Sequence, residues 1–172
     1  TSMATPHMAG MAALVRQYVT KGLAIVDRNE SAELTNELLV STALPQKDPN
    51  GVYYSPRSQG AGLADVGAAV TTPAYISVEG QKAGKLELGD DPSWTGTYPL
   101  NFRVNNLTED TLTYKMKVVV LSAAYSDGYI LDSDQLIAEL DMGNVTVPVG
   151  GCDVSETLQL TNAQIGALKD QF

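Results

Sequence analysis

Apolar residues crowd the start of the chain with almost no polar interruption. Between residues 3 and 15 the only polar side chains are Thr5 and His7, and five of the others are alanine or glycine. A helix that is apolar on every side is typical of the interior of a large domain. The pattern therefore predicts a buried first helix that runs to about Lys21.

Helical spacing returns in a second segment. Three leucines lie on one side of a second predicted helix, Leu34, Leu38 and Leu39. This helix follows a polar stretch at residues 27–30, continues towards Ala43 and ends before Pro45. Residues 45–60 contain three prolines and an Asn-Gly pair, so they predict an irregular loop. A glycine-rich turn then leads into a short helix at residues 66–70.

From Thr72 onward the pattern changes from helical to alternating. Apolar side chains occupy every second position in residues 98–104 and again in residues 112–120, and a polar turn separates the two runs. Such a pair predicts an antiparallel hairpin with one buried face and one wet face. Shorter strands are predicted on either side, at residues 75–78, 85–88, 144–147 and 154–160.

Several short strands at this spacing predict an antiparallel β-sandwich. A last helix should follow, because Thr161 and Gln164 have the spacing of a capping box. Its apolar stripe would consist of Ile165, Leu168 and Phe172. The predicted fold class is therefore α+β, with a helical part at residues 1–72 and the sandwich at residues 73–172.

Composition narrows the function classes. The chain has 172 residues, of which 44% are hydrophobic and 18% charged, so it is expected to be globular. The net charge of −9 argues against nucleic acid and anionic membrane surfaces as partners. No apolar run is long enough to cross a bilayer. Cys152 is the only cysteine, which excludes an internal disulfide and a cysteine-based metal site.

Two acidic clusters invite comparison with calcium loops. Asp90 and Asp91 are adjacent, and residues 132–134 read Asp-Ser-Asp. Neither cluster continues into a loop of alternating oxygen ligands with its glycine, so both are expected to be solvated turn acids. No cofactor-binding or metal-binding residue is therefore predicted.

Ser2 stands where the first helix begins. The unpaired N–H groups and the positive dipole end of a helix favour a developing anion, as an acyl-transfer nucleophile requires. A serine in this position is more often simply an N-cap. His7 cannot be its base within one helix, because five residues at about 100° each turn it roughly 140° away. An N-terminal nucleophile at Thr1 is a further alternative, although a chain boundary explains Thr1 more simply.

The motif around Ser2 favours catalysis. Residues 1–10 read Thr-Ser-Met-Ala-Thr-Pro-His-Met-Ala-Gly. This run resembles the nucleophile motif of subtilisin-like serine proteases, in which Gly-Thr-Ser-Met-Ala leads into a buried helix carrying Pro-His-x-Ala-Gly. The resemblance implies that Ser2 is the catalytic serine and His7 a buried structural histidine. In that family the base comes from far upstream, and His7 is the only histidine here, so the triad cannot be assembled.

Later segments resemble the multidomain cell-envelope subtilases of the lactocepin and complement-cleaving type. Residues 39–43, 54–57 and 59–62 are similar, in this order, to the end of that protease domain. There a glycine-rich turn closes the catalytic domain, and a short helix hands the chain to the next module. The resemblance implies that residues 1–72 are the C-terminal segment of a subtilisin-like peptidase domain.

In those proteases a fibronectin type III-like domain follows. Its turns are similar to residues 104–106 and to the Val-Pro-Val-Gly run at residues 147–150. The resemblance implies a domain of this kind at residues 73–172, with a further strand expected after the end of the chain. An unpaired sheet edge invites strand addition or dimerisation.

The expected activity is peptide-bond hydrolysis by a secreted or cell-wall-attached serine endopeptidase that acts on extended polypeptides. The His, Asp and oxyanion Asn would lie outside this chain, so these residues alone are expected to show no peptidase activity. The competing hypothesis is a non-catalytic spacer or protein-binding module of a surface protein. The expected partners are a polypeptide substrate and a second copy of the chain, with no nucleic acid and no membrane span.

Overall fold

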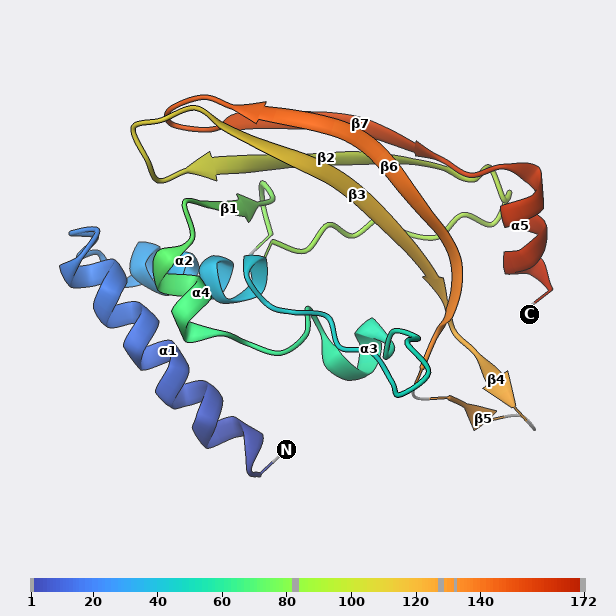
Figure 1. Ribbon diagram of the computed structural model, residues 1–172, viewed down its shortest axis with the longest axis horizontal. Helices are drawn as coiled ribbons and strands as arrows, with labels where there is room; N and C mark the ends of the chain where they lie inside the picture. The colour runs from blue at the N-terminus through green and yellow to red at the C-terminus, as the bar shows by residue number, and fades with distance from the viewer. Residues whose placement is uncertain (1, 82–83, 127–128, 132, 171–172) are drawn as a thin grey trace.

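The computed structural model describes residues 2–81, 84–126, 129–131 and 133–170. Helices come first and antiparallel strands follow, which confirms the α+β class (Figure 1). The helices are α1 (Ala4–Lys21), α2 (Arg28–Ser41), α3 (Pro56–Gln59), α4 (Val66–Thr71) and α5 (Asn162–Lys169). The strands are β1 (Ala74–Ser77), β2 (Thr97–Asn106), β3 (Leu112–Ser122), β4 (Tyr125–Ser126), β5 (Tyr129–Ile130), β6 (Gln135–Val147) and β7 (Cys152–Gln159).

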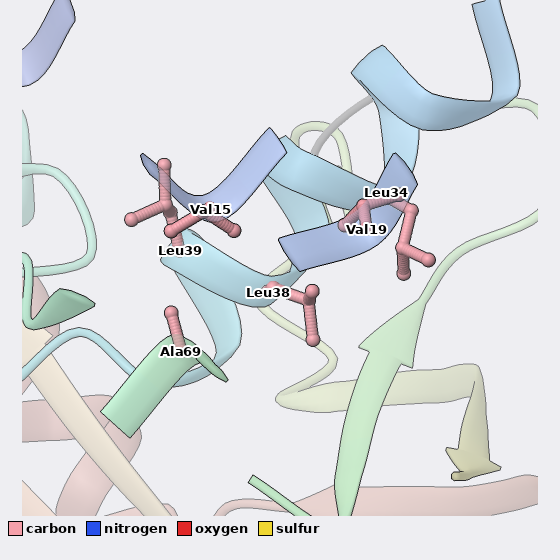
Figure 2. Packing of buried hydrophobic residues seen from close by; sticks show 6 residues of the cluster. All are labelled: Val15, Val19, Leu34, Leu38, Leu39 and Ala69. Atoms are coloured by element: carbon pink, nitrogen blue, oxygen red, sulfur yellow. The ribbon is translucent and has the colours of Figure 1, made fainter. Parts of the chain in front are cut away.

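Three helices pack around one apolar cluster, shown in Figure 2. Its members are Val15 and Val19 of α1, Leu34, Leu38 and Leu39 of α2, and Ala69 of α4. The three leucines that predicted the second helix are all buried, as the spacing requires. Tyr75 of β1 and Leu107 after β2 also pack against this cluster. The helical part and the sheet part therefore share a core.

The second helix starts earlier than its leucines indicate. The stretch at residues 27–30, expected to precede the helix, forms its N-cap and first turn. The Asp27 carboxylate accepts hydrogen bonds from the N–H groups of Asn29 and Glu30, both at 2.9 Å. These bonds satisfy two of the donors that a helix start leaves open. Asp27 followed by Glu30 three residues later was the sequence signal for this start.

The predicted hairpin between residues 98–104 and 112–120 is wrong, although both strands exist. β2 pairs with β1 on one side and β7 on the other, whereas β3 pairs with β6. All these pairings are antiparallel. The connection between β2 and β3 therefore crosses from one sheet to another. Alternation identifies the two faces of a strand and leaves its partner undetermined.

The two sheets share a second apolar cluster. Its buried members are Ala74 of β1, Val104 of β2, Val147 of β6 and Val154 of β7. Phe102 on β2 and Met116 on β3 pack against it from the two sheets. Because both sheets bury apolar side chains in this cluster, β2 and β3 contribute to the same core without pairing with each other.

The smaller strand predictions have mixed outcomes. Residues 75–78 and 154–160 correspond to β1 and β7, and residues 144–147 are the end of the much longer β6. Residues 85–88 form no strand. The last helix begins as predicted, because Thr161 Oγ1 accepts from the Gln164 N–H and Gln164 Oε1 accepts from the Thr161 N–H. Phe172, expected on its apolar stripe, lies outside the described residues.

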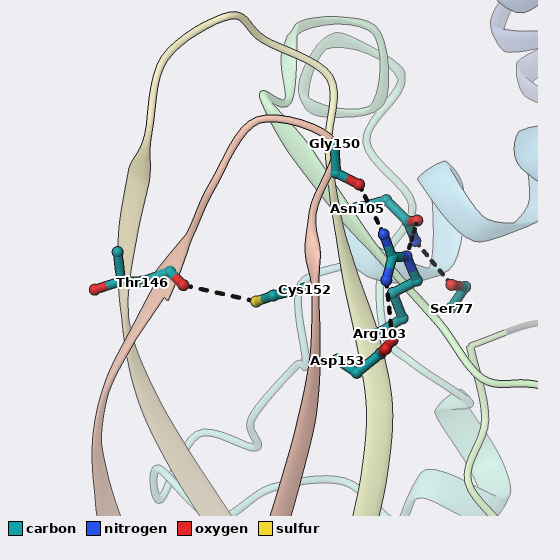
Figure 3. Close-up of polar contacts among 7 residues, drawn as sticks. All are labelled: Ser77, Arg103, Asn105, Thr146, Gly150, Cys152 and Asp153. Carbon is teal, nitrogen blue, oxygen red and sulfur yellow. Dashed lines mark hydrogen bonds and ion pairs between the residues drawn. The ribbon is translucent and has the colours of Figure 1, made fainter.

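Arg103 on β2 joins the ends of several strands (Figure 3). Its guanidinium donates to Asn105 Oδ1 at 3.2 Å, to Asp153 Oδ1 at 3.0 Å and to the Gly150 carbonyl at 2.8 Å. Asn105 in turn donates to Ser77 Oγ at 2.7 Å. The network therefore connects β1, β2, β7 and the turn between β6 and β7.

Candidate active site

Ser2 lies two residues before the first residue of α1, near the end of the helix that is marked N in Figure 1. The N-cap residue is Met3, with φ −87° and ψ −35°, and no side chain caps the helix. The N-cap role considered for Ser2 is therefore wrong. Its side chain is exposed, and no described residue hydrogen-bonds its hydroxyl. The hydroxyl lies near the positive end of the helix dipole.

His7 is neither a base for Ser2 nor a buried residue; it forms a hydrogen bond within its own helix. Its Nδ1 lies 2.8 Å from the carbonyl oxygen of Met3, one helical turn earlier, and donates to it. The residue is exposed, so the prediction of a buried His7 is wrong for this chain. No hydrogen bond joins His7 to Ser2 among the described residues, as the helical geometry predicted.

The surroundings of Ser2 are exposed and apolar. Residues 4–10 of α1 are all exposed, and the predicted burial of this half of the helix is wrong. The exposed fractions are 80% for Met3, 42% for Met8 and 57% for Leu14. α1 packs on α2 and α4 through Val15 and Val19, which lie in its second half. Within the described residues, no element covers the first half.

No histidine is placed to act as a base for Ser2 among the described residues. His7 is the only histidine of the chain and its Nδ1 is engaged with the backbone. Among the described residues, no group of three or more His, Cys, Asp or Glu side chains could hold a metal ion. The candidate site therefore consists of one exposed serine near the start of α1.

Asp91, in the first of the two acidic clusters, has a structural role. Asp91 accepts hydrogen bonds from the N–H groups of Thr95 and Gly96, both at 3.0 Å, and from the Tyr98 hydroxyl at 3.2 Å. The backbone bonds from Thr95 and Gly96 lower the pKa of the Asp91 carboxyl. Burial, and then the bond to Asp91, raise the pKa of Tyr98. Asp91 thus stabilises a turn through hydrogen bonds from Thr95, Gly96 and Tyr98.

Asp134 departs from the expected solvated acid. It is 5% exposed, and Arg57 Nη2 lies 3.5 Å from its Oδ1. Asp132, the other acid of this cluster, lies outside the described residues. The Arg57–Asp134 pair had no signal in the sequence, because Arg57 of the short helix α3 and Asp134 of a loop are far apart along the chain.

One apolar groove occurs elsewhere in the described part of the chain, with a volume of about 340 Å³. Its lining includes Ile76 of β1, Phe102 of β2 and Met116 of β3, and none of its lining residues belongs to α1. It is therefore separate from the candidate nucleophile. No helix in the described residues is long and apolar enough to span a bilayer.

Comparison with known proteins agrees with the motif at Ser2. Residues 1–62 match the model of the subtilase family. The chain is 34% identical over 177 residues to the PII-type proteinase of Lactococcus lactis subsp. cremoris, an alignment that covers 87% of this chain and 9% of that protein. It is 23% identical over 150 residues to a C5a peptidase of Streptococcus pyogenes serotype M6, with 86% of this chain and 12% of that protein covered.

The chain spans about a tenth of the length of the curated relatives it matches, at 9% and 12%. The aligned region nevertheless includes most of this chain, so the sheet part takes part in the likeness as well as the helices. The resemblance to subtilisin-like peptidases is confirmed. With Ser2 at the start of α1, residues 1–62 of this chain belong to the subtilase family.

Proposed function

We propose that this chain is a part of a subtilisin-like serine endopeptidase and that Ser2 is its nucleophile. The match of residues 1–62 to the subtilase family carries the proposal. The local geometry supports it, because the Ser2 hydroxyl is exposed and is not used as a helix cap. The hydroxyl oxygen of Ser2 attacks the carbonyl carbon of a scissile peptide bond, and N–H groups at the helix start favour the oxyanion that forms.

The chemistry needs a base that these 172 residues do not supply. The proton of the Ser2 hydroxyl must pass to an imidazole, and His7 Nδ1 is bound to the Met3 carbonyl. We therefore place the base, the acid that orients it and the oxyanion amide in polypeptide beyond these residues. It follows that the 172-residue chain alone has no peptidase activity.

A fluorophosphonate probe tests both statements. In the longer polypeptide that carries this segment, the probe should label Ser2, and Ser2→Ala should abolish labelling and peptide hydrolysis. Ser41→Ala is the matched control, because Ser41 Oγ accepts from the Ile76 N–H and lies outside the motif. In the 172-residue chain, labelling of Ser2 should be slower by at least about 10³-fold, as expected when the triad is incomplete. Rapid labelling of the short chain at Ser2 would overturn its predicted inactivity.

This assignment also implies how the chain is divided into domains. Residues 1–72 form the end of the peptidase domain, and residues 73–172 form a fibronectin type III-like sandwich. The arrangement β1-β2-β7 opposite β3-β6 supports a two-sheet domain. We infer an extracellular or cell-wall location, and extended polypeptides as substrates. A second copy of the chain is the partner expected at the exposed helix or at a sheet edge.

A non-catalytic spacer or protein-binding module is the second candidate. The missing base favours it, since Ser2 has no described partner within the chain. The polypeptide upstream of Thr1 separates the two candidates. An Asp and a His-Gly-Thr-type motif there would support the peptidase, whereas a start codon directly before Thr1 would support the binding module.

A further inference from the structure

The helical part and the sheet part meet at a second place, far along the chain from the shared core. Tyr54, in the loop before α3, forms an antiparallel bridge with Ser133. The Asp134 N–H donates to the Tyr53 carbonyl at 2.9 Å, and Ser133 Oγ donates to Asp48 Oδ2 at 3.1 Å. We call this contact the seam: residues 48–57 on one side, and Ser133 and Asp134 on the other.

A buried charge lies in the seam. Asp134 is 5% exposed, and no described residue hydrogen-bonds its Oδ1. Burying a carboxylate in this way costs free energy unless a cation compensates it. Arg57 supplies that cation, because its Nη2 lies 3.5 Å from Oδ1. No other ion pair of Asp134 is present among the described residues.

Arg57 is held in position by a buried serine. Ser55 is 1% exposed, and its Oγ accepts from Arg57 Nε at 3.2 Å and from the Arg57 N–H at 3.3 Å. These bonds orient the guanidinium towards the seam. Arg57 follows Pro56 in the first turn of α3, which Ser55 caps. The orientation of the Arg57 guanidinium therefore depends on Ser55, which lies on the same side of the seam.

This pair differs from the other four ion pairs of the described residues. Those pairs are Lys85–Glu87, Arg103–Asp153, Lys115–Asp141 and Lys117–Glu139. Each of them lies within the sheet part, and both partners are well exposed. Exposed pairs contribute little to stability. Among the described ion pairs, Arg57–Asp134 alone connects the helical part to the sheet part and contains a buried partner.

We propose that the Arg57–Asp134 pair is a latch that fixes the end of the β3–β6 sheet against the segment that matches the subtilase family. The backbone bonds of the seam set its register, and the ion pair neutralises the one charge that closing the seam buries. The latch makes the sheet part move as one body with the loop at residues 45–60. It holds whether or not Ser2 is catalytic.

Hydrogen exchange of the folded 172-residue chain tests the latch. The Asp134 amide reports on the seam, because it donates to the Tyr53 carbonyl. Arg57→Met leaves the Asp134 charge buried and unpaired, so exchange at this amide should rise by about tenfold or more. Asp134→Asn removes the charge at nearly constant shape and should raise it less. The Arg57→Met, Asp134→Asn double variant should resemble Asp134→Asn alone.

Lys115→Met is the matched control, since it breaks an exposed pair with Asp141 within the sheet part and should leave exchange at Asp134 unchanged. The relative increases in exchange at the Asp134 amide among the variants decide the outcome. If Arg57→Met leaves exchange at the Asp134 amide as in the wild type, the latch is refuted. Equal damage from Asp134→Asn and Arg57→Met would also refute it, because packing would then explain both. If Arg57→Met unfolds the chain, recovery of folding in the double variant supports the latch and continued unfolding refutes it.

Discussion

At the scale of single residues, Asp91 shows how a surface acid can organise a loop. Its carboxylate gathers the N–H groups of Thr95 and Gly96 and the hydroxyl of Tyr98 at the start of β2. Trp94, within the same turn, has a φ of 53°, a conformation that few residues adopt. The hydrogen bonds to Asp91 therefore offset the unfavourable backbone conformation of this turn.

The lowered pKa of Asp91 predicts a pH dependence of stability. Its ordinary value is 3.8, and the backbone bonds from Thr95 and Gly96 hold the folded-state pKa below that. The contribution is therefore fully present above the unfolded pKa and is lost as the pH falls through the folded pKa. Asp91→Asn should lower the midpoint of urea unfolding at pH 7, and the difference from the wild type should shrink below about pH 4.

Asp90→Asn is the control for this experiment, because no hydrogen bond of the Asp90 side chain is present among the described residues. Its unfolding midpoint at pH 7 should equal that of the wild type. If the Asp91→Asn difference stays constant from pH 7 to pH 3, the bonds to the carboxylate are not its cause.

Only part of the candidate site could be predicted from the sequence. The ten-residue motif predicts Ser2 as the nucleophile, and the helical angle argues against His7 as its base. The exposure of His7 and of the first half of α1 could not be predicted from them, because an apolar helix indicates a buried surface without saying which polypeptide covers it. Asp134 was missed for a related reason: burial of a loop acid depends on a partner far along the chain.

At the scale of elements, the helices were more predictable than the sheet. Helical spacing and caps are local, so α1, α2, α4 and α5 follow from short stretches of sequence. The pairing of β2 with β7 joins residues about 50 positions apart, such as Arg103 and Asp153. Nothing within either strand encodes that choice. Residues 85–88 alternate like a strand and form none, because alternation without a pairing partner does not make a sheet.

The turn between β6 and β7 provides a test of element-scale constraints. Gly150 and Gly151 both have positive φ, at 80° and 93°. A methyl group at Gly151 would meet the Val104 carbonyl oxygen, whereas one at Gly150 would point into open space. Gly151→Ala should therefore cost about 2–4 kcal/mol of unfolding free energy, from backbone strain and a clash together. Gly150→Ala should cost about 1 kcal/mol, from backbone strain alone.

Urea unfolding of the two variants measures this difference directly. A loss for Gly151→Ala that is no larger than the loss for Gly150→Ala would contradict the close approach of the turn to β2. Both variants should keep the far-ultraviolet spectrum of the wild type before the transition, because the strands on either side of the turn are unchanged.

At the scale of the whole molecule, the exposed apolar half of α1 and the net negative charge have opposite effects on self-association. Met3, Met8 and Leu14 leave an apolar surface on one helix, and apolar surface favours association. The net charge of −9 opposes the approach of two copies. Salt screens that repulsion without weakening apolar contact. We therefore expect the 172-residue chain to self-associate through α1, and to do so more strongly as the salt concentration rises.

Leu14→Glu tests this expectation, because Leu14 is 57% exposed and lies outside the buried cluster. The change should leave folding intact and weaken self-association by about tenfold or more, since burying one leucine is worth roughly 1.5–3 kcal/mol. Val26→Glu is the matched control: Val26 is 83% exposed but lies between α1 and α2, so the variant adds the same charge without touching α1. Sedimentation velocity at low and high salt distinguishes the outcomes. Equal weakening by both variants would assign the effect to charge, and association that falls as salt rises would assign it to ion pairs; either result would remove the helix face as the contact surface.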